Sequence, residues 1–252
     1  MATRSEDRAR PVRHARRANR PEPGGTLRMF RLGILATAAL GAVGVAAGAA
    51  QAVAFTDGYS SDSGGIAVAS NQAYALSNAG DKSAFQDSFT IHQYGPVFAA
   101  NVRNDAVAES VSCSADAPCR SVSLSFQIDT MAGTNIHLDA VNLSNAENVH
   151  CPGCSTVAGA YQFVVDTPGA FTLSPAAEAQ LAAIHRQLNA LSDSSLSISD
   201  VQSQADALAV QVAAVLKTAA ASAPAGPVAE PQTVKAAAAS PSVRVYRDFQ
   251  QY

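Results

Sequence analysis

The sequence lacks the motifs that carry most recognisable enzyme chemistry. Its 252 residues contain no His-Glu-x-x-His zinc-peptidase motif, no Gly-x-Ser-x-Gly nucleophile motif, and no Walker or dinucleotide-binding loop. The five histidines have no partners at ligand spacing, and the acidic residues are scattered. The sequence therefore nominates no catalytic residue, no cofactor and no histidine-based metal site, and it favours a non-enzymatic protein.

Basic residues are scarce beyond the N-terminus. The first 31 residues carry nine arginines and three acidic residues, which leaves eight basic and 17 acidic residues for the rest of the chain. A nucleic-acid-binding domain presents a basic face, which this acidic remainder does not offer. Nucleic acid is therefore not an expected partner, and residues 1–31 are predicted to be a disordered, Arg-rich N-region.

Charge is absent from a long run that follows this N-region. No charged residue occurs from Leu32 to Thr56, and Arg28 and Arg31 form a basic flank before the run. This arrangement is typical of an export signal, although the run is also long enough to span a bilayer. Residues 32–54 are accordingly predicted to be either a signal-peptide h-region or a retained membrane anchor.

Small residues near the end of this run favour cleavage, because Ala-x-Ala motifs end at Ala52 and Ala54. The mature protein is expected to be secreted or anchored to the outer face of the cytoplasmic membrane. The membrane is a partner only if residues 32–54 are retained. Residues 55–65 then form a predicted linker.

Four cysteines form two close pairs in the middle of the chain: Cys113, Cys119, Cys151 and Cys154. Export implies an oxidising compartment, where an even number of cysteines indicates disulfides. Three pairings are possible, and local pairing within each cluster is favoured. A four-sulfur zinc site next to His150 is an alternative, but the five-residue gap in the first pair departs from the usual two to four.

Cys151-Pro-Gly-Cys154 also invites a thiol–disulfide oxidoreductase interpretation. That chemistry normally places the first cysteine at the start of a helix, which lowers the pKa of its thiol. The residues after Cys154 have the pattern of a strand instead. A structural disulfide is therefore favoured over a redox centre.

Residues 66–168 are predicted to be a β-rich domain built from two Cys-pair repeats. In Arg120–Thr130 apolar residues alternate with Ser121, Ser123, Ser125, Gln127 and Asp129, which predicts a strand with one face in water. Further strands are predicted at 136–143 and 155–165. The segments after Cys119 and Cys154 align with a period of 35 residues.

An Asn-x-x-Asn element precedes each cysteine pair, at 101–104 and 142–145. Asparagine suits turns, so these elements are expected in loops. Two repeats are fewer than a solenoid needs. The expected fold class is therefore α+β, a small antiparallel β domain in which duplicated strand pairs close one core, followed by an antiparallel helical hairpin.

The hairpin is predicted at 174–217, with Ser174 and Asp200 as N-caps and two apolar stripes that bury against each other and the sheet. An Ala/Pro-rich linker follows at 218–241. The aromatic tail at 242–252 is predicted to be either disordered or a strand docked on a sheet edge.

The order of these motifs resembles a family of exported proteins from high-GC Gram-positive bacteria. The resemblance covers about Asn71 to Leu216 and rests on NQAYALSNAGDKSAFQDSFTI, CRSVSLSFQI, CPGCSTVAGAYQFVV and the hairpin after TLSP. Members are often named peptide zinc metalloprotease proteins, which implies a role beside a membrane zinc peptidase. This chain lacks the His-Glu-x-x-His helix that such an activity requires.

A non-enzymatic, extracytoplasmic binding or structural domain is the expected function. Its partner would be a protein, a peptide or an envelope component, contacted by the polar face of residues 121–129 and by the Asn-bearing loops. The alternatives are a thiol–disulfide oxidoreductase that uses Cys151 and Cys154, and an accessory component of a membrane zinc peptidase system. The sequence leaves the oligomeric state open.

Overall fold

The computed structural model describes residues 54–58, 65–193, 195–224 and 240–252. The predicted N-region, nearly all of the predicted signal, residues 59–64 of the linker and residues 225–239 lie outside this part of the chain. The elements in chain order are β1 (Ala54–Gly58), β2 (Gly65–Asn78), β3 (Ser83–Val111), β4 (Arg120–Ala132), β5 (His137–Val149), β6 (Ser155–Thr167), α1 (Pro175–Asn189), η1 (Ala190–Asp193), α2 (Ile198–Ala221) and β7 (Ser242–Gln251).

The strands form a two-sided coil in which the chain passes alternately through two sheets. Sheet A has the order β1, β3, β4, β6 and β7, and sheet B consists of β2, β3 and β5. Strand β3 belongs to both sheets. Its residues 83–93 pair with β4, its residues 97–111 pair with β2 and β5, and the register shifts between Gln93 and Pro96.

The predicted mixture of a sheet and a following helical hairpin is confirmed, but the antiparallel arrangement is wrong. Every strand pair is parallel except that of β6 with β7. The prediction failed because β2 and β3, which precede the first cysteine pair, already belong to the same coil. With these strands included, the chain has enough turns to stack as a short solenoid.

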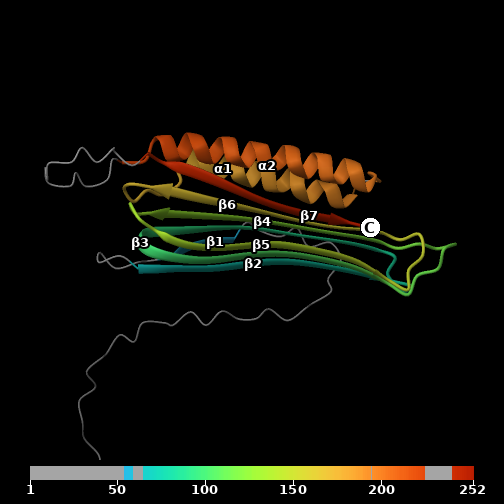
Figure 1. Ribbon diagram of the computed structural model, residues 1–252. Coiled ribbons are helices and arrows are strands. Elements are labelled where there is room, and N and C mark those ends of the chain that lie inside the picture. Colours follow the sequence, from blue (N-terminus) through green and yellow to red (C-terminus); the bar gives the residue numbers. More distant parts are fainter. Residues whose placement is uncertain (1–53, 59–64, 194, 225–239) are drawn as a thin grey trace, which may run out of the picture. The chain divides into compact units, whose positions relative to one another are not determined.

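The main apolar core lies between sheet A and the helical hairpin. The outward side chains of β4 and β6, including Leu124, Phe126 and Phe163, are fully buried beneath α1 and α2. Figure 1 shows the hairpin (orange) covering one side of the strands, with β2 on the side away from it. The predicted burial of both helical stripes against the sheet is therefore confirmed.

The other side of β4 faces sheet B and not water. Ser121, Ser123, Ser125, Gln127 and Asp129 each have no exposed surface. Alanines from both sheets, such as Ala106, Ala108 and Ala160, fill the rest of this interior. The predicted wet face was wrong because strict alternation shows that two faces differ in polarity, but it does not show what covers the polar one.

The helical hairpin begins and turns at serine caps. Ser174 Oγ accepts the Ala177 N–H at 3.2 Å, and Pro175 occupies the first turn, as predicted. The N-cap of α2 is Ser197, whose Oγ accepts the N–H of Asp200, the residue that was predicted to be the cap. Neither helix in the described ranges is long and apolar enough to cross a membrane.

The C-terminal tail is the last strand, β7, which pairs antiparallel with β6. Its inward side chains also reach the edge of sheet B, where Asp248 Oδ2 accepts the Ser144 N–H at 2.7 Å and Gln250 Oε1 accepts the Ala146 N–H at 3.4 Å. Strand β7 therefore closes the C-terminal end of both sheets. The docked strand is the second of the two alternatives predicted for this tail.

Candidate functional site

The four cysteines come together at one end of the coil as two stacked local pairs. Cys113 and Cys119 lie in the turn before β4, with Cα atoms 6.0 Å apart, and Cys151 and Cys154 lie in the turn before β6, with Cα atoms 5.6 Å apart. The Cys119 N–H points to Cys154 Sγ at 3.0 Å. The pairs therefore stabilise equivalent turns in successive coils.

The backbone of these turns repeats as well. Ser112 and His150, which directly precede the cysteine pairs, have φ angles of 58° and 49°. These two residues directly follow β3 and β5, whose last residues, Val111 and Val149, pair with each other. In both turns, a residue with left-handed backbone conformation is followed by a disulfide-closed loop, and this unit returns the chain from sheet B to sheet A.

The burial of the sulfur atoms favours a structural role. All four cysteines are at most 7% exposed, and Cys154 is followed by strand β6 and not by a helix. The four Sγ atoms lie within 4.8 Å of one another, which resembles a structural zinc donor set only if the thiols are reduced. As disulfides, the same atoms offer no thiolate to a metal or to a substrate.

A ladder of asparagine side chains runs through the interior. Asn71, Asn104 and Asn142 occupy equivalent positions on β2, β3 and β5. The Asn71 amide donates to Asn104 Oδ1 at 3.1 Å, and the Asn104 amide donates to Asn142 Oδ1 at 2.8 Å. Asn104 and Asn142 thus lie within strands and not in the predicted loops, so they are not available as a loop binding site.

Sequence reasoning missed the first member of this ladder. Asn71 begins an Asn-x-Ala triplet that recurs at Asn104, and this shared triplet could have revealed the earlier repeat. The ladder is anchored to sheet A, because Asn71 and Asn104 both contact Ser125. Its function is to join the two sheets without a thick apolar core.

Asp129 is a buried carboxyl group in the same interior. The Gln127 amide contacts Asp129 Oδ1 at 3.5 Å, and no hydrogen bond to Oδ2 is found within the described part of the chain. Burial raises the pKa of Asp129 well above its usual value. His92 lies at the equivalent position on β3, and burial lowers its pKa. Both shifts favour neutral side chains between the sheets.

A second buried polar cluster joins α1 to sheet A. His185 Nε2 lies 3.0 Å from Asp87 Oδ2, and both residues are less than 5% exposed. With its amide oriented to satisfy its neighbours, Asn189 donates to both Asp87 oxygens at 2.9 and 2.6 Å. His185 also stacks on Phe89. The cluster is covered by the hairpin, so it serves as an anchor and not as an accessible acid–base site.

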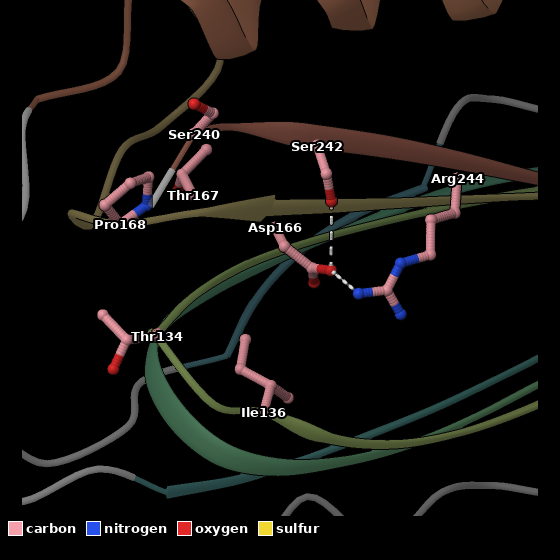
Figure 2. Close-up of a pocket in the computed structure, with 9 residues that line it drawn as sticks. Thr134, Ile136, Asp166, Thr167, Pro168, Ser240, Ser242 and Arg244 are labelled. Atoms are coloured by element: carbon pink, nitrogen blue, oxygen red, sulfur yellow. Dashed lines mark hydrogen bonds and ion pairs between the residues drawn. The ribbon is translucent and has the colours of Figure 1, made fainter. Parts of the chain in front are cut away.

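A small pocket of about 160 Å³ lies where β6 ends and β7 begins (Figure 2). Asp166 is its central group. Its Oδ2 atom lies 2.7 Å from Nη2 of Arg244, with which it forms an ion pair, and accepts a hydrogen bond from Ser242 Oγ at 3.4 Å. Burial raises the pKa of Asp166, while Arg244 and Ser242 oppose that shift. Thr134 and Ile136 approach from the turn before β5. The ion pair engages only Oδ2, and Asp166 Oδ1 is buried without a hydrogen-bond partner in the described part of the chain.

The outer face of sheet B is an accessible surface of the coil. Parallel registers place the outward residues of β2, β3 and β5 in rows such as Gln72, Asp105 and Leu143. Apolar side chains on it are well exposed: Ile66 is 62%, Val68 is 69% and Leu143 is 48% exposed. The hairpin covers the corresponding face of sheet A.

Charges on this face are mostly acidic. Its rows carry four carboxylates and one guanidinium, from Asp105, Glu109, Asp139, Glu147 and Arg103. Arg103 Nε is 2.6 Å from Asp105 Oδ2, so the arginine is already paired. The remaining carboxylates give the face a negative character that disfavours anionic polymers.

No family model, no curated protein and no solved structure matches the chain.

Proposed function

We propose that the chain is a non-enzymatic, extracytoplasmic binding domain that contacts a protein, a peptide or an envelope component through the outer face of sheet B. The asymmetry of the two sheets carries this proposal. The outer face of sheet A is buried by α1 and α2, whereas that of sheet B exposes Val68 and Leu143 among polar side chains. A sheet face that no other element of the described chain covers leaves these side chains accessible to a partner.

The predicted export signal, the acidic composition and the cysteine pairs support the extracytoplasmic part of the proposal. The stacked cysteine pairs and the buried asparagine ladder favour a rigid scaffold. A rigid surface loses little conformational entropy when it binds, which suits a recognition domain.

Cosedimentation of the exported protein with isolated cell walls and membranes of a high-GC Gram-positive bacterium tests the proposal. The variant Leu143→Glu adds charge to the sheet B face, and Val210→Glu is its matched control, because Val210 is 71% exposed on α2. We expect the unaltered protein and Val210→Glu to bind, and Leu143→Glu to bind at least tenfold more weakly. Equal binding by the two variants, or no binding by the unaltered protein, would contradict the proposal.

A further inference from the structure

The two ends of the coil differ in how their strand edges are covered. At the C-terminal end, β7 pairs with β6 and its side chains satisfy backbone N–H groups of β5. At the N-terminal end, β2 pairs with β3 alone among the described strands. One carbonyl of β2, that of Val68, accepts the Tyr94 hydroxyl at 2.7 Å. The outer edge of β2 is thus a 14-residue strand edge without a partner strand in the described chain.

This edge also lacks the features that normally prevent pairing. Natural edge strands are protected by charged residues, prolines or bulges. The β2 sequence, GIAVASNQAYALSN, contains no charged residue and no proline, and its one register shift lies at its start, between Gly65 and Ile66. A long, uncharged edge favours the addition of another strand.

The spacing of the coil shows which part of this chain could cover β2. In sheet B, Ile66 pairs with Ala99 and Ala99 with His137, which are separations of 33 and 38 residues. A preceding strand of the same coil would therefore come from within residues 28–45. This segment begins with Arg28 and Arg31 and continues into the apolar run predicted to be a cleaved export signal. Under the proposed export, the segment that the coil spacing assigns to this position is removed from the mature chain.

We propose that β2 is a homodimer interface, in which two copies pair edge to edge and antiparallel about a two-fold axis centred on Gln72. A two-fold axis requires the same surface on both copies, and an uncharged strand can meet itself without like-charge repulsion. With the two-fold axis at Gln72, exposed Val68 of each copy lies opposite Leu76 of the other, so this contact occurs twice. Such cross-strand apolar pairs stabilise antiparallel sheets.

The dimer adds to the proposed function. It also rests on that proposal, because export is what removes the segment before β1. With the axis perpendicular to the sheet, the outer faces of both copies lie on the same side. The two three-stranded faces then form one continuous six-stranded face. A partner with a repeating structure could contact both halves, which raises its affinity through multivalency.

Sedimentation velocity of the exported protein, with its N-terminus mapped by mass spectrometry, tests the dimer without any ligand. We expect a dimer at about 10 μM. The variant Gln72→Lys places two lysines opposite each other and is expected to raise the dimer dissociation constant at least tenfold, because like charges directly opposite destabilise a strand pair. The matched control is Asn145→Lys, which adds the same charge to β5 on the same face, and it is expected to stay dimeric.

A cross-link provides a second measurement that does not depend on weakening the interface. Gln72→Cys is expected to form a disulfide-linked dimer under mild oxidation, whereas Asn145→Cys is not. A monomer at 100 μM, a Gln72→Lys dimer as tight as the unaltered one, or a retained N-terminal segment that keeps the chain monomeric would overturn the dimer. Failure of the envelope-binding assay alone would leave these readouts unchanged, so the two proposals can fail separately.

Discussion

The carboxylate of Asp248 accepts the backbone N–H of Ser144 at 2.7 Å, although 104 residues separate them in sequence. This contact ties the C-terminal strand to the edge of sheet B. It also makes β7 a cap for both sheets, because the same strand pairs with β6 in sheet A.

Removing this acceptor is expected to destabilise the C-terminal edge. Asp248→Ala leaves the Ser144 N–H without its partner, which costs about 1–3 kcal/mol in the free energy of unfolding. Urea denaturation measures the loss, and amide hydrogen exchange should show Ser144 exchanging faster. The control is Gln251→Ala on the same strand, whose side chain is exposed. Unchanged exchange at Ser144 would show that the cap does not depend on this carboxylate.

Asn101 and Asn104 belong to the same Asn-x-x-Asn element, but only Asn104 is part of the buried asparagine ladder. Asn104 is fully buried and contacts Asn71, Ser125 and Asn142, whereas Asn101 on the same strand is exposed. We expect Asn104→Ala to cost about 3 kcal/mol or more, because several buried polar groups lose partners at once. Asn101→Ala should change the free energy of unfolding by about 0.5 kcal/mol or less. Equal effects in chemical denaturation would contradict the ladder.

Asp129 predicts a specific dependence of stability on pH. Its pKa is raised in the folded state, so the folded protein holds a proton that the unfolded chain releases near a pH of about 4. Asp129 makes its full contribution to the free energy of unfolding below that pH, and this contribution is lost as the pH rises toward the folded-state pKa. We therefore expect Asp129→Asn to be more stable than the unaltered protein at pH 7, with the difference shrinking toward pH 4. A constant difference across this window, measured by thermal unfolding, would argue against a buried neutral carboxyl.

Because the Asp87–His185 pair is buried, breaking it is expected to lower the free energy of unfolding. Asp87→Ala leaves His185 and Asn189 without their acceptor beneath the hairpin, which costs about 3–5 kcal/mol. Replacing both partners, as in Asp87→Leu with His185→Leu, should cost less than the sum of the single changes. The exposed Arg103–Asp105 pair is the control, and Asp105→Ala should cost about 1 kcal/mol or less. Additive single changes in the double-mutant cycle would rule out coupling.

The stacked cysteine pairs close short loops, with sequence separations of 6 and 3 residues. Loop-closure entropy gives each about 2 kcal/mol of stabilisation. We expect Cys113→Ala with Cys119→Ala, and Cys151→Ala with Cys154→Ala, each to lower the free energy of unfolding by that amount. Added zinc should leave the melting temperature of the oxidised protein unchanged. Free thiols at all four positions in mass mapping would contradict the disulfides and favour a zinc site.

The 35-residue period of the cysteine repeats correctly predicted which residues are neighbours in sheet A, but not those in sheet B. Gln127 and Gln162, matched by the period of 35, are direct neighbours in sheet A. In sheet B the neighbours Asn104 and Asn142 are 38 residues apart, because the turns between the sheets differ in length. The two Asn-x-x-Asn elements were matched with Asn101 opposite Asn142, three residues out of register, and both were assigned to loops because asparagine suits turns. A period measured on one sheet does not transfer across turns of unequal length.

Burial of polar side chains was the other feature that the sequence could not reveal. The alternation in β4 correctly placed Val122 and Phe126 on one face. It gave no sign that Ser125 and Asp129 face a second sheet, since a polar face is usually solvated. Their partners come from strands that lie elsewhere in the sequence, such as Asn71 on β2. Contacts of this range depend on topology and not on local pattern.

The pairing of β6 with β7 has a consequence for the order of folding. Asp166 pairs with Ser242 and Val157 with Gln251, across 76 and 94 residues, whereas β4 and β6 pair across 35. Long-range pairings form slowly because chain closure must precede any stabilising contact. During synthesis the coils can assemble in sequence, but the edges of β5 and β6 lack their β7 partner until residues 242–251 emerge. We therefore expect the two sheets to lack their C-terminal cap until β7 docks.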